Sequence, residues 1–435
     1  MDPIVIIGAG LAGCEAAWQI ARRGGKVILF EMKPAVYSSA HRSPFFAELV
    51  CSNSFKSESL ENASGVLKEE LGRLESLILK VAKEARVPAG DSLAVDREVF
   101  SKQITQILES LDNVKVIRKE VSSIPQDQIT VIATGPLTSA ILSQEIQKMT
   151  GNRSLFFYDA ISPIVTADSI DFQRAFKSSR YGKGGDDYVN CPMDEEAYNQ
   201  FVLALNQAER VPLRPFERRY LFEGCLPVEE MAERGRETLA FGPLKPVGLI
   251  DPKTGKQPFA VVQLRQEDRF KTLFNLVGFQ TRLKHEEQKR VFRMIPGLEK
   301  AEFVRLGSIH RNTFIDSPRL LGESLQLKAF PSLFFAGQIT GVEGYMESTA
   351  MGLLSGISAY RHANGLPILI PPPTTAMGAL IRYITHSLTV PFQPMNINFG
   401  LFPPLPGKSR GRQKRLLFAK RALRDVEEWE KKNEI

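Results

Sequence analysis

The sequence is poor in cysteine, with only four among 435 residues. Four cysteines are too few for a disulfide-stabilised scaffold, and their spacing matches no zinc motif. No apolar run approaches the ~18–20 residues that cross a bilayer. The first residues also lack the basic segment and cleavage site of a secretory signal. We therefore expect a cytoplasmic protein with reduced thiols, no metal site and no membrane association.

Acidic residues are absent from one stretch near the C-terminus. Between Lys408 and Arg424 the chain has eight basic residues and no acid, although the net charge of the whole chain is only +7. The rest of the chain is thus close to neutral. Such a block is typical of a tail that binds nucleic acid or another acidic surface, and equally of a solvated helix face. The remaining composition, 43% hydrophobic and 24% charged, is that of a globular protein, and the length suggests two or three domains.

A nucleotide-binding pattern opens the chain. A short β-branched strand leads directly into a G-x-G-x-x-G motif, which is followed by a helix and a second strand. In this context Gly8 allows a tight turn, Gly10 lets the backbone approach a pyrophosphate, and Gly13 lets the helix pack on the strand. A carboxylate 23 positions after Gly8 would bind ribose hydroxyls. The residues that we assign to a dinucleotide here are Gly8, Ala9, Gly10, Gly13 and Glu31.

Two later strands also end in small residues. The strand from Thr130 ends in Ala-Thr-Gly, and a late strand from Leu333 ends in Ala-Gly. Either tripeptide alone would suit an ordinary buried strand. Three such signals in order resemble the fingerprints of two-dinucleotide-binding-domain flavoproteins, so the dinucleotide is expected to be FAD. The further cofactor-binding candidates are Val121, Ala133, Thr134, Gly135, Gly337, Gln338 and Glu343.

The spacing of these signals predicts a discontinuous domain. We expect an α/β fold in which residues 1–160 and 326–435 form a Rossmann-like, glutathione-reductase-like FAD-binding domain. An α+β domain is expected to be inserted at residues 161–325, with strands at 261–264 and 276–279. Within the basic segment we expect a loop followed by an amphipathic helix that begins near Arg415.

Two of the four cysteines lie in positions that suit a reactive thiol. Cys225 lies at or just before an expected helix N-terminus, which lowers a thiol pKa. Glu223 would oppose that shift unless it accepts a proton. Cys51 lies in a Ser-Asn-Ser loop, where a thiol can be accessible. A small buried hydrophobe is the alternative for both. On the residues alone it is supported equally for Cys225, and it is the favoured interpretation for Cys51, Cys14 and Cys191.

Several longer motifs follow one another along nearly the whole chain. They include FAELVCSNS at 46–54, NCPM at 190–193, FEGC at 222–225, HRNT at 310–313 and GVEGY at 341–345. Together they resemble the folate- and FAD-dependent tRNA uracil-C5 methyltransferase family, TrmFO, which is related to the GidA/MnmG flavoproteins. The resemblance implies methylation of a T-loop uridine of tRNA, with 5,10-methylenetetrahydrofolate as the carbon source and NADH or NADPH as the reductant.

The implied chemistry explains the two thiols. C5 of uracil is a poor nucleophile until a thiolate adds to C6, and a methylene group becomes methyl only by gaining a hydride, which reduced FAD can supply. The resemblance implies that the methylene passes through flavin N5 and that Cys51 and Cys225 share the covalent work. We expect Cys225 to attack C6 and Cys51 to act on the flavin side, although the reverse assignment stays open. Either Glu223 or a thiol would remove the C5 proton.

Substrate contacts are also implied. His310 is the candidate for stacking on the folate pteridine, and Glu343 for holding its polar edge. Arg97 would be either a phosphate contact or an exposed first-turn residue. The RNA-binding candidates are Lys408, Arg410, Arg412, Lys414 and Arg415, and those that would line the approach of the uridine are Arg180, Lys183, Arg282, Lys284 and Arg311.

Three functions remain open at this point: methylation of tRNA, the same chemistry on ribosomal RNA or a GidA-like wobble-uridine modification, and an RNA-binding flavoprotein without catalysis. Both thiols argue against the last. We expect a monomer or weak dimer.

Overall fold

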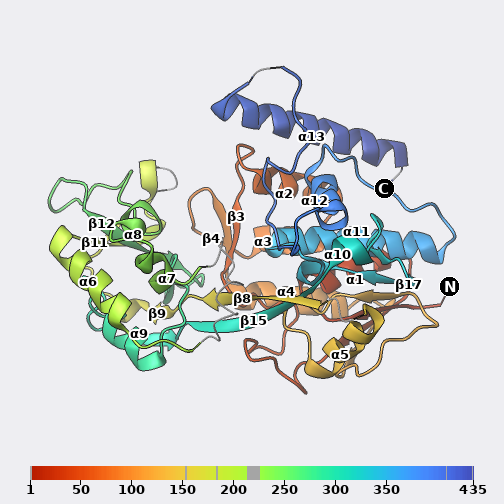
Figure 1. Cartoon of the computed structure of the whole chain (residues 1–435), viewed down its shortest axis with the longest axis horizontal. Helices are drawn as coiled ribbons and strands as arrows, with labels where there is room; N and C mark the ends of the chain where they lie inside the picture. The colour runs from red at the N-terminus through yellow and green to blue at the C-terminus, as the bar shows by residue number, and fades with distance from the viewer. Residues whose placement is uncertain (1, 152–153, 183–184, 213–225, 408, 434) are drawn as a thin grey trace.

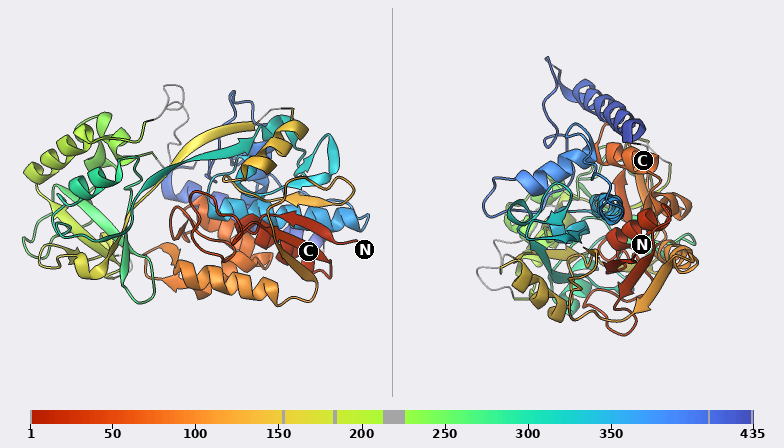
Figure 2. Two further views of the ribbon diagram at one scale, coloured as in Figure 1. Left: turned by 90° about the horizontal axis from the view of Figure 1, so that it is seen from below. Right: turned by 90° about the vertical axis from the view of Figure 1, so that its right-hand side faces the viewer.

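The structure is a computed structural model that describes residues 2–151, 154–182, 185–212, 226–407, 409–433 and 435 (Figure 1). Two sheets occupy different parts of the molecule, and the paired strands β8 (Ser154–Ile161) and β15 (Ser308–Ile315) run between them (Figure 2). Within the described residues no helix is both long and apolar enough to cross a membrane.

The first sheet has six strands in the order β16-β17-β7-β1-β2-β6, and all neighbours are parallel except β16 and β17. Its central strand is buried at every residue, as expected for a parallel sheet covered on both faces. The strands come from both ends of the sequence, which confirms an α/β fold with a discontinuous Rossmann-like sheet. Their bounds are β1 Ile4–Ile7, β2 Val27–Glu31, β6 Val114–Arg118, β7 Thr130–Ile132, β16 Gln326–Leu327 and β17 Phe330–Phe335.

Helices α1 (Leu11–Ala21) and α11 (Tyr345–Ala363) pack closely against each other next to this sheet. A Cβ atom on Gly352 would lie 2.2 Å from the Ala12 carbonyl oxygen, so only glycine fits there. The other helices of this part are α2 Ala63–Arg73, α3 Leu77–Glu84, α4 Arg97–Glu109, α5 Ala140–Met149, α10 Ser317–Leu320 and α12 Ala376–His386. A small antiparallel sheet consists of β3 Ser54–Ser57, β4 Arg86–Val87 and β5 Ser92–Val95.

The second sheet is antiparallel and has its own hydrophobic core. All of its strands lie between residues 164 and 305; the exact domain limits stay a prediction. The strand expected at 261–264 is present. The strand expected at 276–279 instead ends at Leu276, because Gly278 has φ +79° and starts a turn. The elements are β9 Ile164–Thr166, β10 Phe176–Lys177, β11 Tyr188–Met193, β12 Ala260–Gln266, β13 Leu273–Leu276, β14 Phe303–Arg305, α6 Glu195–Gln207, α7 Val228–Glu233, α8 Thr238–Phe241 and α9 His285–Phe292.

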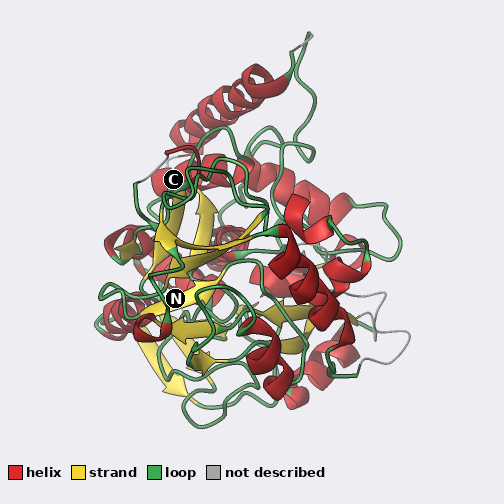
Figure 3. Ribbon diagram, turned by 90° about the vertical axis from the view of Figure 1, so that its left-hand side faces the viewer, coloured by secondary structure: helices red, strands yellow, loops and turns green. Residues whose placement is uncertain are grey.

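The C-terminal helix α13 (Gly411–Asn433) lies at the edge of the molecule, away from both sheets (Figure 3). It begins earlier and ends later than expected, so Arg412 lies in the helix and not in a loop. The acidic residues after Arg424 extend it through i,i+4 ion pairs such as Lys431–Glu427 at 2.7 Å. A stripe at helical spacing, Phe418, Ala422, Val426 and Trp429, is buried against the body.

Candidate functional site

A cavity of about 450 Å³ opens where the carboxyl ends of β1, β2, β7 and β17 meet. Ligands of open α/β folds bind at this position. The structure brings most of the predicted cofactor residues to its wall, and Gly13 is the exception. The lining residues among our candidates are Gly8, Ala9, Gly10, Glu31, Cys51, Val121, Ala133, Thr134, Gly135, His310, Gly337, Gln338 and Glu343.

The β1–α1 turn has the form that its glycines predict. Gly8 has φ +101°, and a Cβ there would lie 2.7 Å from the Ala133 carbonyl oxygen. A Cβ on Gly13 would lie 1.8 Å from the Gly8 carbonyl oxygen, so Gly13 serves packing rather than the cavity wall. At Gly10 the backbone is ordinary (φ −76°), and an added Cβ would meet no atom of the described residues within 4 Å. Neither conformation nor packing therefore requires glycine at position 10.

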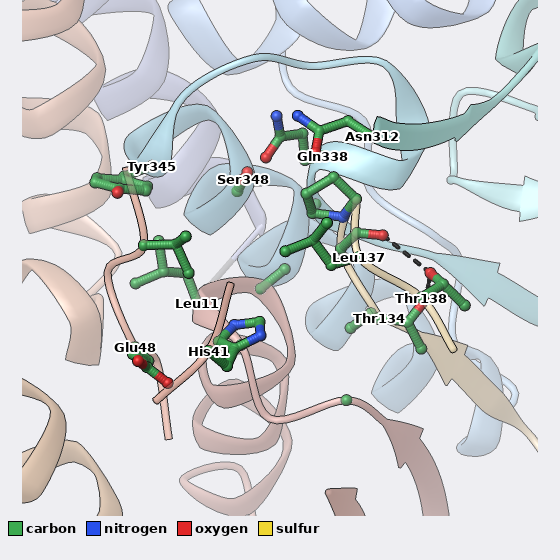
Figure 4. Close-up of a pocket in the computed structure, with 18 of the residues that line it drawn as sticks. Leu11, His41, Glu48, Thr134, Leu137, Thr138, Asn312, Gln338, Tyr345 and Ser348 are labelled. Atoms are coloured by element: carbon green, nitrogen blue, oxygen red, sulfur yellow. Dashed lines mark hydrogen bonds between the residues drawn. The ribbon is translucent and has the colours of Figure 1, made fainter. Parts of the chain in front are cut away.

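Glu31 lies at the end of β2 beside this turn. Its carboxylate accepts hydrogen bonds from the backbone N–H groups of Ala9 at 3.0 Å and Lys33 at 2.9 Å. These bonds orient the carboxylate at the cavity wall, where a ribose is expected. Across the cavity, Thr134 and Thr138 share a hydroxyl–hydroxyl bond of 2.7 Å (Figure 4).

Cys51 lies in a loop on the same wall and is partly exposed. Its thiol donates to the Ala160 carbonyl oxygen at 3.8 Å. The backbone N–H groups of Cys51 and Ser52 both donate to the Tyr345 hydroxyl, each at 3.0 Å. Burial and the neighbouring Cys51 raise the Tyr345 pKa, so its hydroxyl stays protonated. Tyr345 belongs to a motif that the sequence singles out, but sequence reasoning assigned no role to it.

Arg97 supports the backbone just before Cys51. Its guanidinium donates to Leu49 O at 2.7 Å and Val50 O at 3.2 Å, and it forms a bidentate ion pair with Glu267 at 2.6 and 3.0 Å. The expectation of an exposed first-turn residue is wrong, because the side chain is only 17% exposed. The sequence gives no signal for this pair, since 170 residues separate the partners.

Arg265 supports the same loop from the second sheet. Its guanidinium donates to the Asn53 Oδ1 atom at 2.8 Å and the Ser52 hydroxyl at 2.7 Å. Asn53 in turn donates to the carbonyl oxygens of Val95 and Gln266. Contacts from Tyr345, Arg97 and Arg265, which lie on three distant elements, therefore hold the residues on both sides of Cys51.

His310 reaches the cavity from β15. Its ring nitrogens contact the hydroxyls of Ser308 at 2.8 Å and Ser39 at 3.2 Å. Burial, followed by the nearby charge of Arg305, lowers its pKa, so the imidazole is neutral near pH 7. A neutral aromatic ring suits stacking. His41 is a second buried imidazole in this wall, which sequence reasoning missed; burial and then Lys33 lower its pKa to about 4.

Glu343 accepts a short hydrogen bond from the Gln338 side chain, and its carbonyl oxygen accepts one from Asn396 at 2.6 Å. These contacts fix the carboxylate at the rim of the cavity. Figure 4 shows Gln338, Asn312, Ser348 and Tyr345 along one side and Leu11, Glu48 and His41 on the other.

Four predicted residues, Lys183, Glu223, Cys225 and Lys408, lie outside the described residues. The helix expected after Cys225 is α7, although Pro227 precedes its first turn and does not lie within it. Cys14 and Cys191 are buried, and burial raises the pKa of both thiols. The described residues contain no group of His, Cys, Asp or Glu that could hold a metal ion.

The basic candidates differ in their surroundings. Arg410, Arg412, Lys414 and Arg415 are exposed, and Arg412 and Arg415 lie 2.7 and 3.8 Å from Glu61. Arg282 is not an approach residue, because its side chain is only 3% exposed and pairs with Glu230. Lys284 pairs with Glu209 on the surface.

A family model and curated relatives both match this chain over most of its length. The family model described as "Glucose inhibited division protein A" matches residues 3–367. The methylenetetrahydrofolate–tRNA-(uracil-5-)-methyltransferases TrmFO of Citrifermentans bemidjiense and Geobacter sulfurreducens are 58% and 60% identical over 427 residues, with 98% of each chain covered. The structure of Aquifex aeolicus GidA superposes with a TM-score of 0.70 at 16% identity, covering 98% of this chain and 73% of that one. That likeness supports the fold alone.

Proposed function

Because the chain belongs to the GidA family and, within it, to the TrmFO methyltransferases, we propose that it methylates C5 of a uridine in tRNA with methylenetetrahydrofolate and FAD. The observation that carries this proposal is the position of Cys51. A partly exposed thiol, with its flanking backbone fixed by Tyr345, Arg97 and Arg265, lies on the wall of a cavity that the glycine turn also forms.

The residues present fit FAD. Gly10 leaves open space at the N-terminus of α1, where backbone N–H groups and the helix dipole favour a pyrophosphate. Glu31 is held where a ribose would lie, and Gly337 and Gln338 begin the turn η5 (Gly337–Thr340) in front of α11. These residues, with Ala133 to Gly135, would hold the dinucleotide. When bound, the flavin supplies hydride equivalents, and the folate supplies a carbon at the formaldehyde oxidation level.

Each side chain of the wall has a role in this proposal. Cys51 provides a nucleophilic thiol, or a proton donor and acceptor, on the cofactor side of the cavity. The protonated Tyr345 hydroxyl fixes the backbone at Cys51. The neutral His310 ring offers a stacking face for the pteridine, and the oriented Glu343 carboxylate an acceptor for its N–H edge. Cys225 is proposed to add to uracil C6, and either Glu223 or a thiol to remove the C5 proton.

The test uses the purified protein, methylenetetrahydrofolate labelled in its one-carbon unit, and NADH or NADPH. Separate tRNA and ribosomal RNA transcripts are supplied. We expect label in the 5-methyl group of uracil in tRNA only. Label in ribosomal RNA alone would move the substrate to the alternative, and no transfer to either RNA by a protein with bound, reducible FAD would refute the proposal. Comparing the two nicotinamide cofactors identifies the reductant.

The thiol roles need a separate experiment. A Cys225→Ala variant is expected to lose the covalent complex with RNA that contains 5-fluorouridine, whereas Cys51→Ala retains it. A complex that survives in Cys225→Ala and is lost in Cys51→Ala would reverse the assignment.

A further inference from the structure

The 3₁₀ turn η2 (Arg180–Gly182) holds an exposed tyrosine in a rare conformation. Tyr181 has φ +58° and ψ 22°, inside the left-handed region that bulky side chains seldom adopt. Its side chain is 64% exposed. An aromatic ring kept both exposed and in an uncommon backbone conformation serves no core packing, so it calls for a ligand.

The Tyr181 ring packs against Gly248. A Cβ atom on Gly248 would lie only 2.8–3.0 Å from three carbon atoms of the Tyr181 ring, so the ring rests directly on that glycine. The Tyr181 N–H also donates to the Gly248 carbonyl oxygen at 3.0 Å. With 64% of the residue exposed, much of the ring remains open to solvent on top of this support.

A fixed guanidinium accompanies the ring. Arg180 donates through Nε to the Gln263 side-chain oxygen at 2.8 Å and through Nη1 to the Val247 carbonyl oxygen at 2.9 Å. Neither acceptor is a carboxylate, so the positive charge of Arg180 is oriented but not neutralised by these bonds. A planar aromatic surface next to an oriented arginine is the combination that binds single-stranded nucleic acid.

The turn η2 is connected to the candidate site through one face of β12. Gln263, which holds Arg180, and Arg265, which holds Ser52, lie two residues apart and therefore point to the same face, about 7 Å from each other along the strand. Arg265 lines the cavity next to Cys51.

From these contacts we propose that Tyr181 and Arg180 form a platform on which an unstacked base of the RNA substrate stacks, close to the uridine in the cavity. The inference rests on the proposed function. An enzyme that draws a base out of its stack must compensate for the lost stacking, and an aromatic ring does so with little dependence on base identity because every base has a π face. The adjacent guanidinium suits the phosphate of the same nucleotide.

The test compares Tyr181→Asn with Tyr181→Phe. Asparagine tolerates the left-handed conformation, so the first variant removes the ring without adding backbone strain, whereas the second retains the ring. Tyr181→Gly is a second ring deletion that relaxes the backbone. Dissociation constants for a tRNA transcript, flavin content, melting temperature and NAD(P)H oxidation without RNA are measured for each variant.

Both ring deletions are expected to weaken tRNA binding roughly 5- to 150-fold, the factor that corresponds to the loss of one stacked base. The Phe variant should bind as the unmodified protein does, and the flavin and oxidation readouts should not change. Equal RNA affinity in Asn, Gly and Phe variants would overturn the platform, and an equal loss in Phe would show a hydroxyl contact instead of stacking. If the unmodified protein neither binds nor methylates RNA, the proposed function fails first; if it does both and the deletions have no effect, only the platform fails.

Discussion

At the residue scale, the Tyr345 hydroxyl determines how the Cys51 backbone is held. Tyr345→Phe removes the acceptor of two N–H groups but keeps the ring packed against Phe55 at a centroid distance of 5.5 Å. Leaving such donors without a partner costs ~1–3 kcal/mol. We expect methyl transfer to fall by about one order of magnitude or more while flavin content is retained. Methylation kinetics check this, and an unchanged rate would show that the loop does not need the hydroxyl.

Burial sets the charge of His41 in the same cavity. Burial and Lys33 lower its pKa to about 4, whereas in the unfolded chain it is near 6.5. The unfolded chain therefore takes up a proton between pH 6.5 and 4 that the folded chain does not. As the pH is lowered through this window, the free energy of unfolding therefore decreases. The contribution is at most ~3.5 kcal/mol at 1.36 kcal/mol per pKa unit.

A His41→Gln variant tests this contribution. Its free energy of unfolding should decrease less than that of the unmodified protein between pH 6.5 and 4, as measured by denaturant titration at several pH values. Two curves that fall in parallel would mean that other groups carry the acid sensitivity.

At the element scale, the β1–α1 turn separates packing glycines from a binding glycine. Gly10→Ala places its Cβ in open space in an ordinary backbone conformation, so stability should change by less than about 0.5 kcal/mol. Its FAD affinity should nevertheless fall, because the added carbon occupies the approach of the pyrophosphate. Gly13→Ala, whose Cβ would lie 1.8 Å from the Gly8 carbonyl oxygen, should lose stability as well. Thermal unfolding and flavin titration distinguish the two; a Gly10→Ala variant with full FAD affinity would contradict the assignment.

Local patterns predict these elements, and distant pairs do not follow from them. The glycine turn, the strands that begin the cavity wall and the buried Cys14 are dictated by neighbours in the sequence. The helix expected within the basic segment is shorter than α13, because the acidic residues beyond Arg424 continue the same helix through i,i+4 ion pairs. The pairs Arg97–Glu267 and Arg265–Ser52 join residues 170 and 213 positions apart. A single sequence does not show which residues of such distant segments lie opposite each other in the fold.

At the scale of the whole molecule, the charge of α13 is divided along its length. The half from Gly411 to Arg424 is basic, whereas acidic residues from Asp425 pair with Arg73 of α2 and help to dock the other half on the body. The helix is thus anchored from Phe418 onward, by its buried stripe and by the ion pairs to Arg73, and its first turns present cations. In the proposed function, phosphate contacts with these cations would fix the position of the RNA and carry little sequence information, so uridine selection would fall to the cavity.

Replacing Arg410, Arg412, Lys414 and Arg415 together by glutamine should weaken tRNA binding and flatten its salt dependence. Each phosphate contact contributes roughly 0.7–0.9 to the slope of log K against log salt concentration. Arg412 and Arg415 already lie near Glu61, so the slope should decrease by roughly 1.5 to 2.5, below the roughly 2.8 to 3.6 expected for four independent contacts. The matched control is Lys431→Gln with Lys432→Gln at the opposite end of α13, which removes charge without touching the basic half and should leave the slope unchanged. An equal decrease in both variants would attribute the effect to net charge, and no decrease in either would identify the basic half as a solvated helix face.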